Sequence, residues 1–327
     1  MLAAMQGTLS DWYESTSGLP ARLQGGVVAI GNFDGVHLGH RAVLEQTLEI
    51  ARTTSVPALA LTFEPHPRTF FRPQQPVFRL TGARRKAHLL LDAGMDGVVS
   101  EPFDDGLARQ TAEDFLQKHL QQGLKVSHVV AGHDFHFGRN RGGTPDLLMQ
   151  WGREHGFGVT LIDAFNDPQQ PSSIVSSSRI RTALGEGDVA TANRLLDRPF
   201  DVAGTVVEGA RLGRTLGYPT ANLKLPEETQ LRHGVYAVRL QRADGSLHDG
   251  VASFGRRPTF DNGAPLLETF IFDFSGDLYG EAVTVFFHGW IRAEEKFESA
   301  EALVYQMDED SLAARRILER SPPVTVQ

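Results

Sequence analysis

The sequence predicts two domains of different classes: an α/β domain with a parallel sheet, then a small all-β barrel that a helix closes. Short apolar runs alternate with helical patterns over the first half of the chain. After Arg198-Pro199 the apolar runs follow one another closely and are joined by turn residues, and a helical pattern returns at 299–319. The length of 327 residues is comfortable for two domains.

Buried strands are expected at the apolar runs of the first half, and helices are expected between and after them. The strands are 27–30, 57–63, 96–99, 128–131 and 158–163, and the helices are 37–52, 81–93, 111–121 and 145–156. Thr111 with Asp114 three residues later is typical of a helix cap, and Pro145 suits a first helical turn. This alternation predicts a parallel, doubly wound sheet.

Two further helices are expected at 178–185 and 188–196, before a β-rich region. Its strands are expected at 200–208, 234–241, 248–254, 266–274 and 280–288. Ala243-Asp244-Gly245-Ser246 is a good hairpin turn. Short strands at close spacing indicate a small barrel. We therefore expect domains at 1–187 and 188–327.

Composition narrows the class of function. A net charge of −8 and a pI near 5.8 argue against general nucleic-acid binding, which needs a basic surface. No apolar stretch is long enough to span a membrane, and no secretory signal is visible, so a cytoplasmic location is expected. The absence of cysteine excludes disulfides, thiolate catalysis and thiolate metal sites.

The densest motif of the first half is the segment 31–40, which follows the apolar run Val27-Val28-Ala29-Ile30. Its two histidines stand three residues apart, so in a helix they share a face. They would lie at a helix N-terminus, where free backbone N–H groups favour anions. We expect a triphosphate site here, lined by Gly31, Phe33, Asp34, His37, Gly39 and His40. A zinc site is less favoured because no third ligand stands at metal spacing.

Two other strand ends carry possible ligand-binding groups. Phe63, Pro65 and His66 follow the second strand and suit an apolar wall for a flat ligand, although a rigid loop with core aromatics is the alternative. After the fourth strand, Asp134 and Phe135 precede Arg139, whose guanidinium beside glycines fits phosphate contact. A solvated basic loop is the alternative there.

The serine run at 176–178 opens the next expected helix. Ser178 is expected to cap it, and Arg181 lies one turn further on, where it can hold leaving-group charge. A serine run is often only a cap. The chain has no Gly-x4-Gly-Lys-Ser/Thr motif, so any kinase activity must hold its nucleotide in another way.

The second half has its own motif at 213–222. Thr220 and Asn222 alternate, so in an extended segment they share a side, and their oxygens suit Mg²⁺. Gly213 and Gly217 would let a loop close over phosphates. Glu268 stands inside an apolar strand, where a carboxylate is costly unless it is used or paired, so it is a candidate general base. An outward-facing strand residue is the alternative.

These motifs together resemble the bifunctional bacterial riboflavin kinase/FMN adenylyltransferase family, from about Val27 to Arg320. The segments 31–40 and 175–181 are similar to nucleotidylyltransferase signatures, which alone would indicate only cytidylyl or adenylyl transfer. The second half is more specific, because its segments 213–222, 234–238, 255–260, 273–274, 278–280 and 292–297 all resemble riboflavin kinase. The resemblance implies a Rossmann-like nucleotidylyltransferase domain and a riboflavin-kinase barrel.

The resemblance also implies two ATP-dependent steps: phosphorylation of riboflavin to FMN by the second domain, and adenylylation of FMN to FAD by the first. It implies that His37 and His40 stabilise charge on the reacting phosphates and that Ser178 and Arg181 bind the pyrophosphate end. It places Asp134 near the flavin nucleotide or ribose.

In the second domain the resemblance implies Thr220 as an Mg²⁺ ligand, Asn222 as a residue that positions metal and riboflavin, and Glu268 as the base. One departure is Ser253, which stands where the family pattern more often has Asn.

Riboflavin, FMN and ATP are the expected partners, with transient self-association possible. Two other functions stay open at this point. One is a nucleotidylyltransferase for a different phosphate acceptor with a flavin-binding second domain. The other is a flavin sensor or carrier without turnover.

Overall fold

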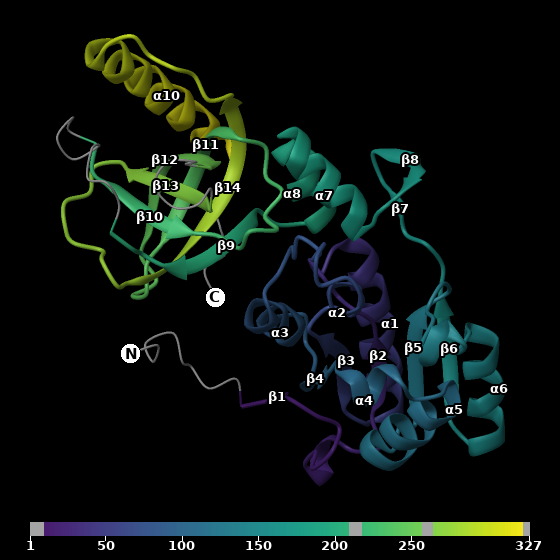
Figure 1. Ribbon diagram of the computed structural model, residues 1–327. Helices are drawn as coiled ribbons and strands as arrows, with labels where there is room; N and C mark the ends of the chain where they lie inside the picture. Colours follow the sequence, from purple (N-terminus) through teal and green to yellow (C-terminus); the bar gives the residue numbers. More distant parts are fainter. Residues whose placement is uncertain (1–9, 209–217, 257–263, 323–327) are drawn as a thin grey trace. The chain divides into compact units, whose positions relative to one another are not determined.

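The computed structural model describes residues 10–208, 218–256 and 264–322. Packing divides them into two units, the first ending at Ser177 and the second beginning at Ser178 (Figure 1). Each unit is described by itself below. The expected functional domain limits, 1–187 and 188–327, remain predictions. No helix within the described ranges is long and apolar enough to cross a membrane.

The first unit contains a six-stranded parallel sheet in the order β1-β4-β3-β2-β5-β6. Its strands are β1 (Trp12–Tyr13), β2 (Val27–Ile30), β3 (Ala58–Glu64), β4 (Gly97–Pro102), β5 (His128–Gly132) and β6 (Gly158–Ile162). The strand order reverses between β2 and β5. Ligands of open α/β sheets bind outside the carboxyl ends of the strands at such a point.

Helices cover both faces of this sheet, as the alternation of patterns predicts (Figure 1). Val27 and Ala29 pack with side chains of α1 (Leu38–Thr54) and α3 (Ala83–Asp92). Val28 and Ile30 face the other core, with η2 (Leu116–Leu124) and α6 (Pro145–His155). β2 is therefore buried on both sides, which explains its uninterrupted apolar sequence.

The local signals at two helix starts are confirmed. Thr111 and Asp114 form a reciprocal capping box at α5 (Ala112–Phe115), and Pro145 occupies the first turn of α6. The chain continues from α5 into η2 with π-type hydrogen bonds, where an α-helix over 111–121 was expected. Apolar side chains that recur every four residues, as at Leu116, Leu120 and Leu124, fit either helix, so the pattern cannot distinguish them.

Several short elements of the first unit were not expected from the sequence, because none has enough residues to show a period. They are η1 (Ala21–Leu23), β1, α2 (Pro67–Phe71), α4 (Asp105–Ala108), η3 (Arg139–Arg141) and the hairpin of β7 (Asn166–Asp167) with β8 (Gln170–Ile174).

The second unit begins at Ser178, inside α7 (Ser177–Glu186), and continues with α8 (Val189–Leu196). Because α7 starts at Ser177, Ser178 lies in its first turn, and the expectation that Ser178 caps the helix is wrong. The preceding serine, Ser176, stands at the cap position, and a serine run alone does not show which member precedes the helix.

A curled antiparallel sheet follows, in the order β10-β13-β12-β11-β14-β9. Its strands are β9 (Phe200–Thr205), β10 (Thr220–Lys224), β11 (Gly234–Gln241), β12 (Leu247–Arg256), β13 (Pro265–Ile271) and β14 (Ala282–Arg292). A bridge between Val207 and Asn222 joins its two ends, so the expected barrel is confirmed. The expected turn also forms, since Gly245 N–H donates to the Arg242 carbonyl at 3.0 Å.

The barrel and its helix follow from alternation along the strands. Tyr236, Val238 and Leu240 of β11 are fully buried in the barrel interior. The intervening Val235 and Ala237 pack with α10 (Ala300–Arg320) on the outer face. The closing helix is thus confirmed, and it covers the sheet from outside (Figure 1).

Candidate active sites

Two stacked histidines mark the carboxyl end of β2. His37 is the N-cap of α1, and its Nδ1 accepts the backbone N–H of His40 at 3.3 Å. The two rings stack with centroids 3.6 Å apart and planes 14° apart. Because Nδ1 of His37 accepts a hydrogen bond, the neutral ring carries its proton on Nε2. The expectation that both side chains share a face is confirmed, and the pair presents a fixed hydrogen-bond donor.

The stacked pair leaves little space beside Gly39. A Cβ on Gly39 would lie 3.3 Å from the His37 ring and 3.5 Å from the Val175 carbonyl. The turn also places Phe33 at φ 48°, with its ring edge-on to His40 at 5.3 Å and directly over Gly31. The backbone of this turn is therefore packed closely against its own aromatic rings.

Asp34 anchors the turn. Its side chain is 4% exposed and accepts the backbone N–H groups of Leu80 and Thr81, each at 3.0 Å. Its carbonyl accepts the Ser177 hydroxyl at 2.8 Å. These contacts position the turn, while the expected contact of Asp34 with ATP remains a prediction.

The environment of His40 favours the neutral ring. Burial, the His37 ring and the Lys86 ammonium together hold the pKa of His40 well below its usual range. Its Nδ1 is buried and has no hydrogen-bond partner among the described residues. His40 is therefore expected to be neutral near pH 7, so the pair does not carry two positive charges.

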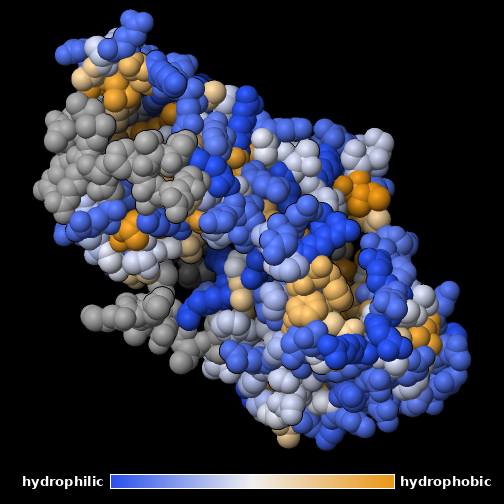
Figure 2. Space-filling view, in the orientation of Figure 1, coloured by the Kyte–Doolittle hydropathy of each residue, from blue (hydrophilic) through white to orange (hydrophobic). Residues whose placement is uncertain are grey.

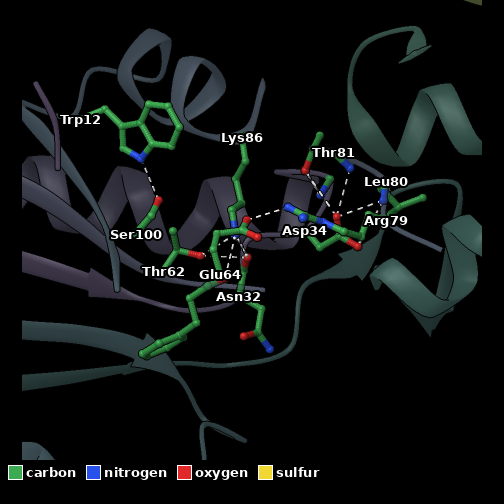
Figure 3. A network of polar contacts seen from close by, with 12 residues as sticks. Trp12, Asn32, Asp34, Thr62, Glu64, Arg79, Leu80, Thr81, Lys86 and Ser100 are labelled. Atoms are coloured by element: carbon green, nitrogen blue, oxygen red, sulfur yellow. Dashed lines mark hydrogen bonds and ion pairs between the residues drawn. The ribbon is translucent and has the colours of Figure 1, made fainter. Parts of the chain in front are cut away.

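Lys86 is a buried cation that the sequence reasoning missed. It is 3% exposed, and its ammonium lies 2.8 Å from Oε1 of Glu64, which also pairs with Arg79 at 2.6 Å (Figure 3). Lys86 also donates to the Asn32 carbonyl at 3.1 Å and to the Thr62 hydroxyl at 2.9 Å. In the sequence it was one polar residue of the expected helix 81–93, and nothing in that pattern signalled its burial.

The loop after β3 exposes a different aromatic ring from the one that was expected. Phe63 is only 7% exposed and belongs to the core, whereas Phe71 on α2 is 62% exposed. Phe70, Phe71 and Phe103 contact one another edge-on, with centroids 5.3–5.6 Å apart, and we call them the aromatic platform. Figure 2 shows an apolar patch over α2. Phe63 supports this platform from the core through Phe103.

Pro65 and His66 lead from β3 into α2. Pro65 is exposed, and Nδ1 of His66 accepts the backbone N–H of Arg68 at 3.1 Å. His66 is the N-cap of α2. The residue pair thus positions the short helix that carries Phe71, and its expected flavin contact remains a prediction.

The loop after β5 starts beside the histidine turn, because β5 is the neighbour of β2 in the sheet. Asp134 and Arg139 are exposed. Phe135 is half-buried and stacks on Phe137 with centroids 5.4 Å apart. These side chains therefore follow the second of the two strands at the point of order reversal. Ser178 and Arg181 lie on α7 in the other packing unit, so their expected pyrophosphate contacts remain predictions.

In the second unit, strand register brings Glu268 between two polar residues. Asn222 of β10 and Ser253 of β12 are its direct neighbours on either side. Thr220 pairs with Phe270 two residues away, so Thr220, Asn222 and Glu268 share one face of the sheet. Sequence alternation predicted this shared side for Thr220 and Asn222, but their pairing with β13 required the tertiary structure.

Asn222 has an unused acceptor. It is 3% exposed, and its amide nitrogen donates to the Thr220 carbonyl at 3.2 Å. Its Oδ1 is buried without a hydrogen-bond partner in the part of the chain that the structure describes. A buried orphan oxygen is costly unless a ligand satisfies it. The described residues contain no cluster of three or more His, Cys, Asp or Glu side chains suited to a metal.

An open groove lies between this sheet face and α10, and the sequence reasoning missed it. Its volume is about 550 Å³, and its lining residues are Tyr218, Phe270, Phe272, Asp308, Ser311, Leu312 and Arg315. Tyr218 hydrogen-bonds Asp308, and burial together with that carboxylate raises the pKa of Tyr218 to about 12. Phe270 and Phe272 stand two and four positions after Glu268 in the expected strand, so all three share one face. This spacing could have indicated the apolar half of the groove.

Both parts of the chain are similar to known protein families. A family model described as FAD synthetase matches residues 19–179, and one described as riboflavin kinase matches residues 196–318. A bifunctional riboflavin kinase/FMN adenylyltransferase of Pseudomonas fluorescens is 41% identical over 90% of this chain and 93% of its own. A protein of the same description from Escherichia coli K12 is 38% identical over 92% of this chain and 95% of its own.

This chain belongs to the bifunctional riboflavin kinase/FMN adenylyltransferase family. It carries both enzyme domains, with the FAD synthetase part before the riboflavin kinase part. Riboflavin, FMN and ATP are accordingly its substrates.

The family fold extends to a solved structure described as a macrolide-efflux protein of Streptococcus pneumoniae. It is 30% identical, with a TM-score of 0.82 over 93% of this chain and 98% of that one. The efflux description concerns that protein alone.

Family membership gives a context to the residues found above. The stacked histidines and the aromatic platform lie within the FAD synthetase match, and Thr220, Asn222 and Glu268 lie within the riboflavin kinase match. The expected phosphate-loop residues Gly213 and Gly217 lie outside the described residues, as does the segment 257–260.

Proposed function

We propose that the two activities of this family use the two sites described above. The stacked pair of His37 and His40 serves adenylyl transfer. The row of Asn222, Glu268 and Ser253 serves riboflavin phosphorylation. The observation that carries the proposal is the position of Glu268 on a sheet face that adjoins an apolar groove. Glu268 stands in register beside Asn222, whose buried Oδ1 has no hydrogen-bond partner among the described residues.

In adenylyl transfer, a phosphate oxygen of FMN forms a bond to the α-phosphorus of ATP, and the bond from that phosphorus to pyrophosphate breaks. Charge develops on the phosphate oxygens, and a fixed donor aimed at it lowers the barrier. The Nε2–H of His37 is such a donor, and the neutral His40 is another. Ser178, Arg181 and Arg139 are proposed to hold the pyrophosphate and phosphate charge, alongside the backbone of Gly31, Asp34 and Gly39.

The flavin of FMN is proposed to lie against the aromatic platform. Phe71 presents an exposed ring there, and stacking on exposed aromatic rings suits a flat tricyclic ligand. Pro65 and His66 adjoin α2, while Asp134 and Phe135 follow β5. Phe63 supports the platform from the core instead of stacking on the ligand.

In riboflavin phosphorylation, Glu268 is proposed to take the proton of the riboflavin 5′-hydroxyl. The hydroxyl oxygen forms a bond to the γ-phosphorus of ATP, and the bond from that phosphorus to the departing ADP breaks. The isoalloxazine ring is proposed to occupy the groove of Tyr218, Phe270 and Leu312. Gly213 and Gly217 remain the expected cover for the ATP phosphates.

The residues present fit Mg²⁺. Thr220 offers a hydroxyl and Asn222 a buried amide oxygen that lacks a partner among the described residues, and both are hard oxygen ligands. Mg²⁺ bound there would neutralise charge on the ATP phosphates. With Thr220 and Asn222 as its protein ligands, the ion would take its other ligands from phosphate and water, as is usual for Mg²⁺.

Two substitutions in the full-length protein test the assignment. Glu268→Gln is expected to lower the rate of FMN formation from riboflavin at least about a hundredfold, with FMN-to-FAD conversion unchanged. His40→Ala is expected to lower FAD formation about a hundredfold, equivalent to about 3 kcal/mol, with FMN formation unchanged. Chromatography of riboflavin, FMN and FAD over time measures both steps.

The exposed Glu319→Gln serves as a matched control in the second unit and is expected to leave both rates unchanged. Equal loss of both activities in either site variant would refute separate sites.

Location and assembly remain part of the proposal. We place the enzyme in the cytoplasm because ATP, which both steps consume, is supplied there. Transient self-association is also proposed, and sedimentation of the protein with and without ATP and flavin tests it. A single monomeric species under all conditions would refute it.

A further inference from the structure

Lys86 joins two loops of the first unit through a fully used ammonium group. Its nearest acceptors are the Asn32 carbonyl at 3.1 Å, the Thr62 hydroxyl at 2.9 Å and Oε1 of Glu64 at 2.8 Å (Figure 3). The Phe63 carbonyl is a fourth, more distant acceptor at 3.4 Å. Asn32 belongs to the histidine turn after β2, whereas Glu64 ends β3 and directly precedes Pro65. A single side chain from α3 thus binds both strand ends.

Glu64 extends this connection to the other side of the histidine turn. Its carboxylate also binds Arg79, which directly precedes Leu80 and Thr81. The backbone N–H groups of those two residues hold the carboxylate of Asp34. The histidine turn is therefore held at Asn32 by Lys86 and at Asp34 through the segment that follows Arg79 (Figure 3).

We propose that Lys86 is a positioning residue for adenylyl transfer, which fixes the histidine turn after β2 against the loop after β3. The proposal rests on the function proposed above, in which the first loop holds ATP and the second leads to the FMN platform. Lys86 acts through the backbone and through Glu64, and it is distinct from the groups assigned to the reacting phosphates.

Burial makes this connection sensitive to the chemistry of residue 86. The side chain is 3% exposed, and an ammonium at that depth is tolerated only when it is paired and fully hydrogen-bonded. A side chain of similar length without charge fills the same space but leaves Glu64 and the Asn32 carbonyl without their shared donor. The two loops then lose their common anchor while the sheet beneath them remains.

The expected kinetic effect follows from how the substrates are divided between the loops. Each loop binds its own substrate, so the binding of ATP or FMN alone does not require an exact distance between the two loops. The reaction does require it, because reacting atoms must approach to about 3–3.5 Å, and a misplacement of about 1 Å costs on the order of a hundredfold in rate. Loss of the anchor therefore lowers kcat for FAD formation while changing KM little.

The test compares Lys86→Met, Lys86→Arg and the exposed control Lys118→Met in the full-length protein. Lys86→Met is expected to lower kcat for FMN-to-FAD conversion about a hundredfold, with KM for ATP and FMN within about threefold of wild type. Lys86→Arg retains the cation, so its kcat is expected to be at least about tenfold higher than that of Lys86→Met. Lys118→Met is expected to match wild type, and riboflavin phosphorylation should be unchanged in all three.

Three results would overturn the proposal: an unchanged kcat in Lys86→Met, a loss expressed only in KM, or an arginine variant no better than methionine. If Lys86→Met does not fold, Glu64→Gln decides, because it weakens the same anchor and leaves Lys86 in place. An unchanged kcat in Glu64→Gln would then overturn it. Full activity of His40→Ala would instead refute the proposed function itself, which separates the two failures.

Discussion

At the scale of single residues, the environment of the histidine pair favours a neutral His40 ring. Two imidazoles with centroids 3.6 Å apart cannot both carry charge without strong repulsion, and Lys86 adds a further positive charge nearby. The N-cap hydrogen bond of His37 fixes which ring nitrogen carries the proton. A neutral donor of fixed tautomer suits phosphates whose charge grows during the reaction.

The lowered pKa of His40 has a measurable consequence. Between that pKa and the ordinary value of 6.5, the unfolded chain binds a proton that the folded chain does not. The free energy of unfolding of the first unit is therefore expected to fall as pH drops below about 6.5. Titration of the His40 ring by NMR should give a midpoint well below that value. A midpoint at or above it would contradict the description of this site.

At the scale of elements, the proposed kinase site depends on where α10 lies on the barrel. The helix supplies one wall of the groove and β13 the other, with Glu268 on the same strand face. A partly buried ion pair ties the helix to β14, because Arg292 donates to both oxygens of Asp310 at 2.8 and 2.7 Å. Asp310 is 4% exposed, so its partner cannot easily be replaced by water.

Breaking this pair should loosen the groove. Asp310→Asn is expected to lower the stability of the second unit by about 3 kcal/mol, because it leaves the Arg292 guanidinium without its charged partner. It should also raise KM for riboflavin, while FMN-to-FAD conversion is unchanged. Thermal unfolding and steady-state kinetics measure both effects. The neighbouring exposed Glu309→Gln is the matched control, and identical behaviour of the two variants would contradict this role for the pair.

At the scale of the whole molecule, one chain carries two successive reactions in separate packing units. The product of the second unit is a substrate of the first. If FMN leaves one site and binds the other from solution, the two units need not belong to the same polypeptide.

Mixing two inactive variants tests this independence. Neither Glu268→Gln nor His40→Ala alone is expected to convert riboflavin to FAD efficiently. An equimolar mixture should form FAD after a lag during which free FMN accumulates, because each variant retains one functional site. Chromatographic time courses of the mixture and of each variant alone give the comparison. A mixture that accumulates FMN without forming FAD would show that transfer requires both sites in one chain.

The sequence by itself determined the features that depend on neighbouring residues. The strand and helix periods, the capping box of Thr111 and Asp114 and the shared face of His37 and His40 are all local, because each is set within a few positions of the chain. β10 was recognised only as a possible extended segment, although its five residues alternate polar and apolar at every position and so carried a local strand signal.

Only the tertiary structure decided what depends on distant segments. The burial of Lys86, the exposure of Phe71 in place of Phe63 and the burial of Asn222 each depend on which strands and helices pack around them. Pairing of Glu268 with both of its neighbours likewise requires the closed sheet. The periodicity of apolar residues along the sequence indicates which way a side chain faces. Its packing partner comes from a distant part of the chain, and that partner determines whether the side chain is buried and which charges lie near it.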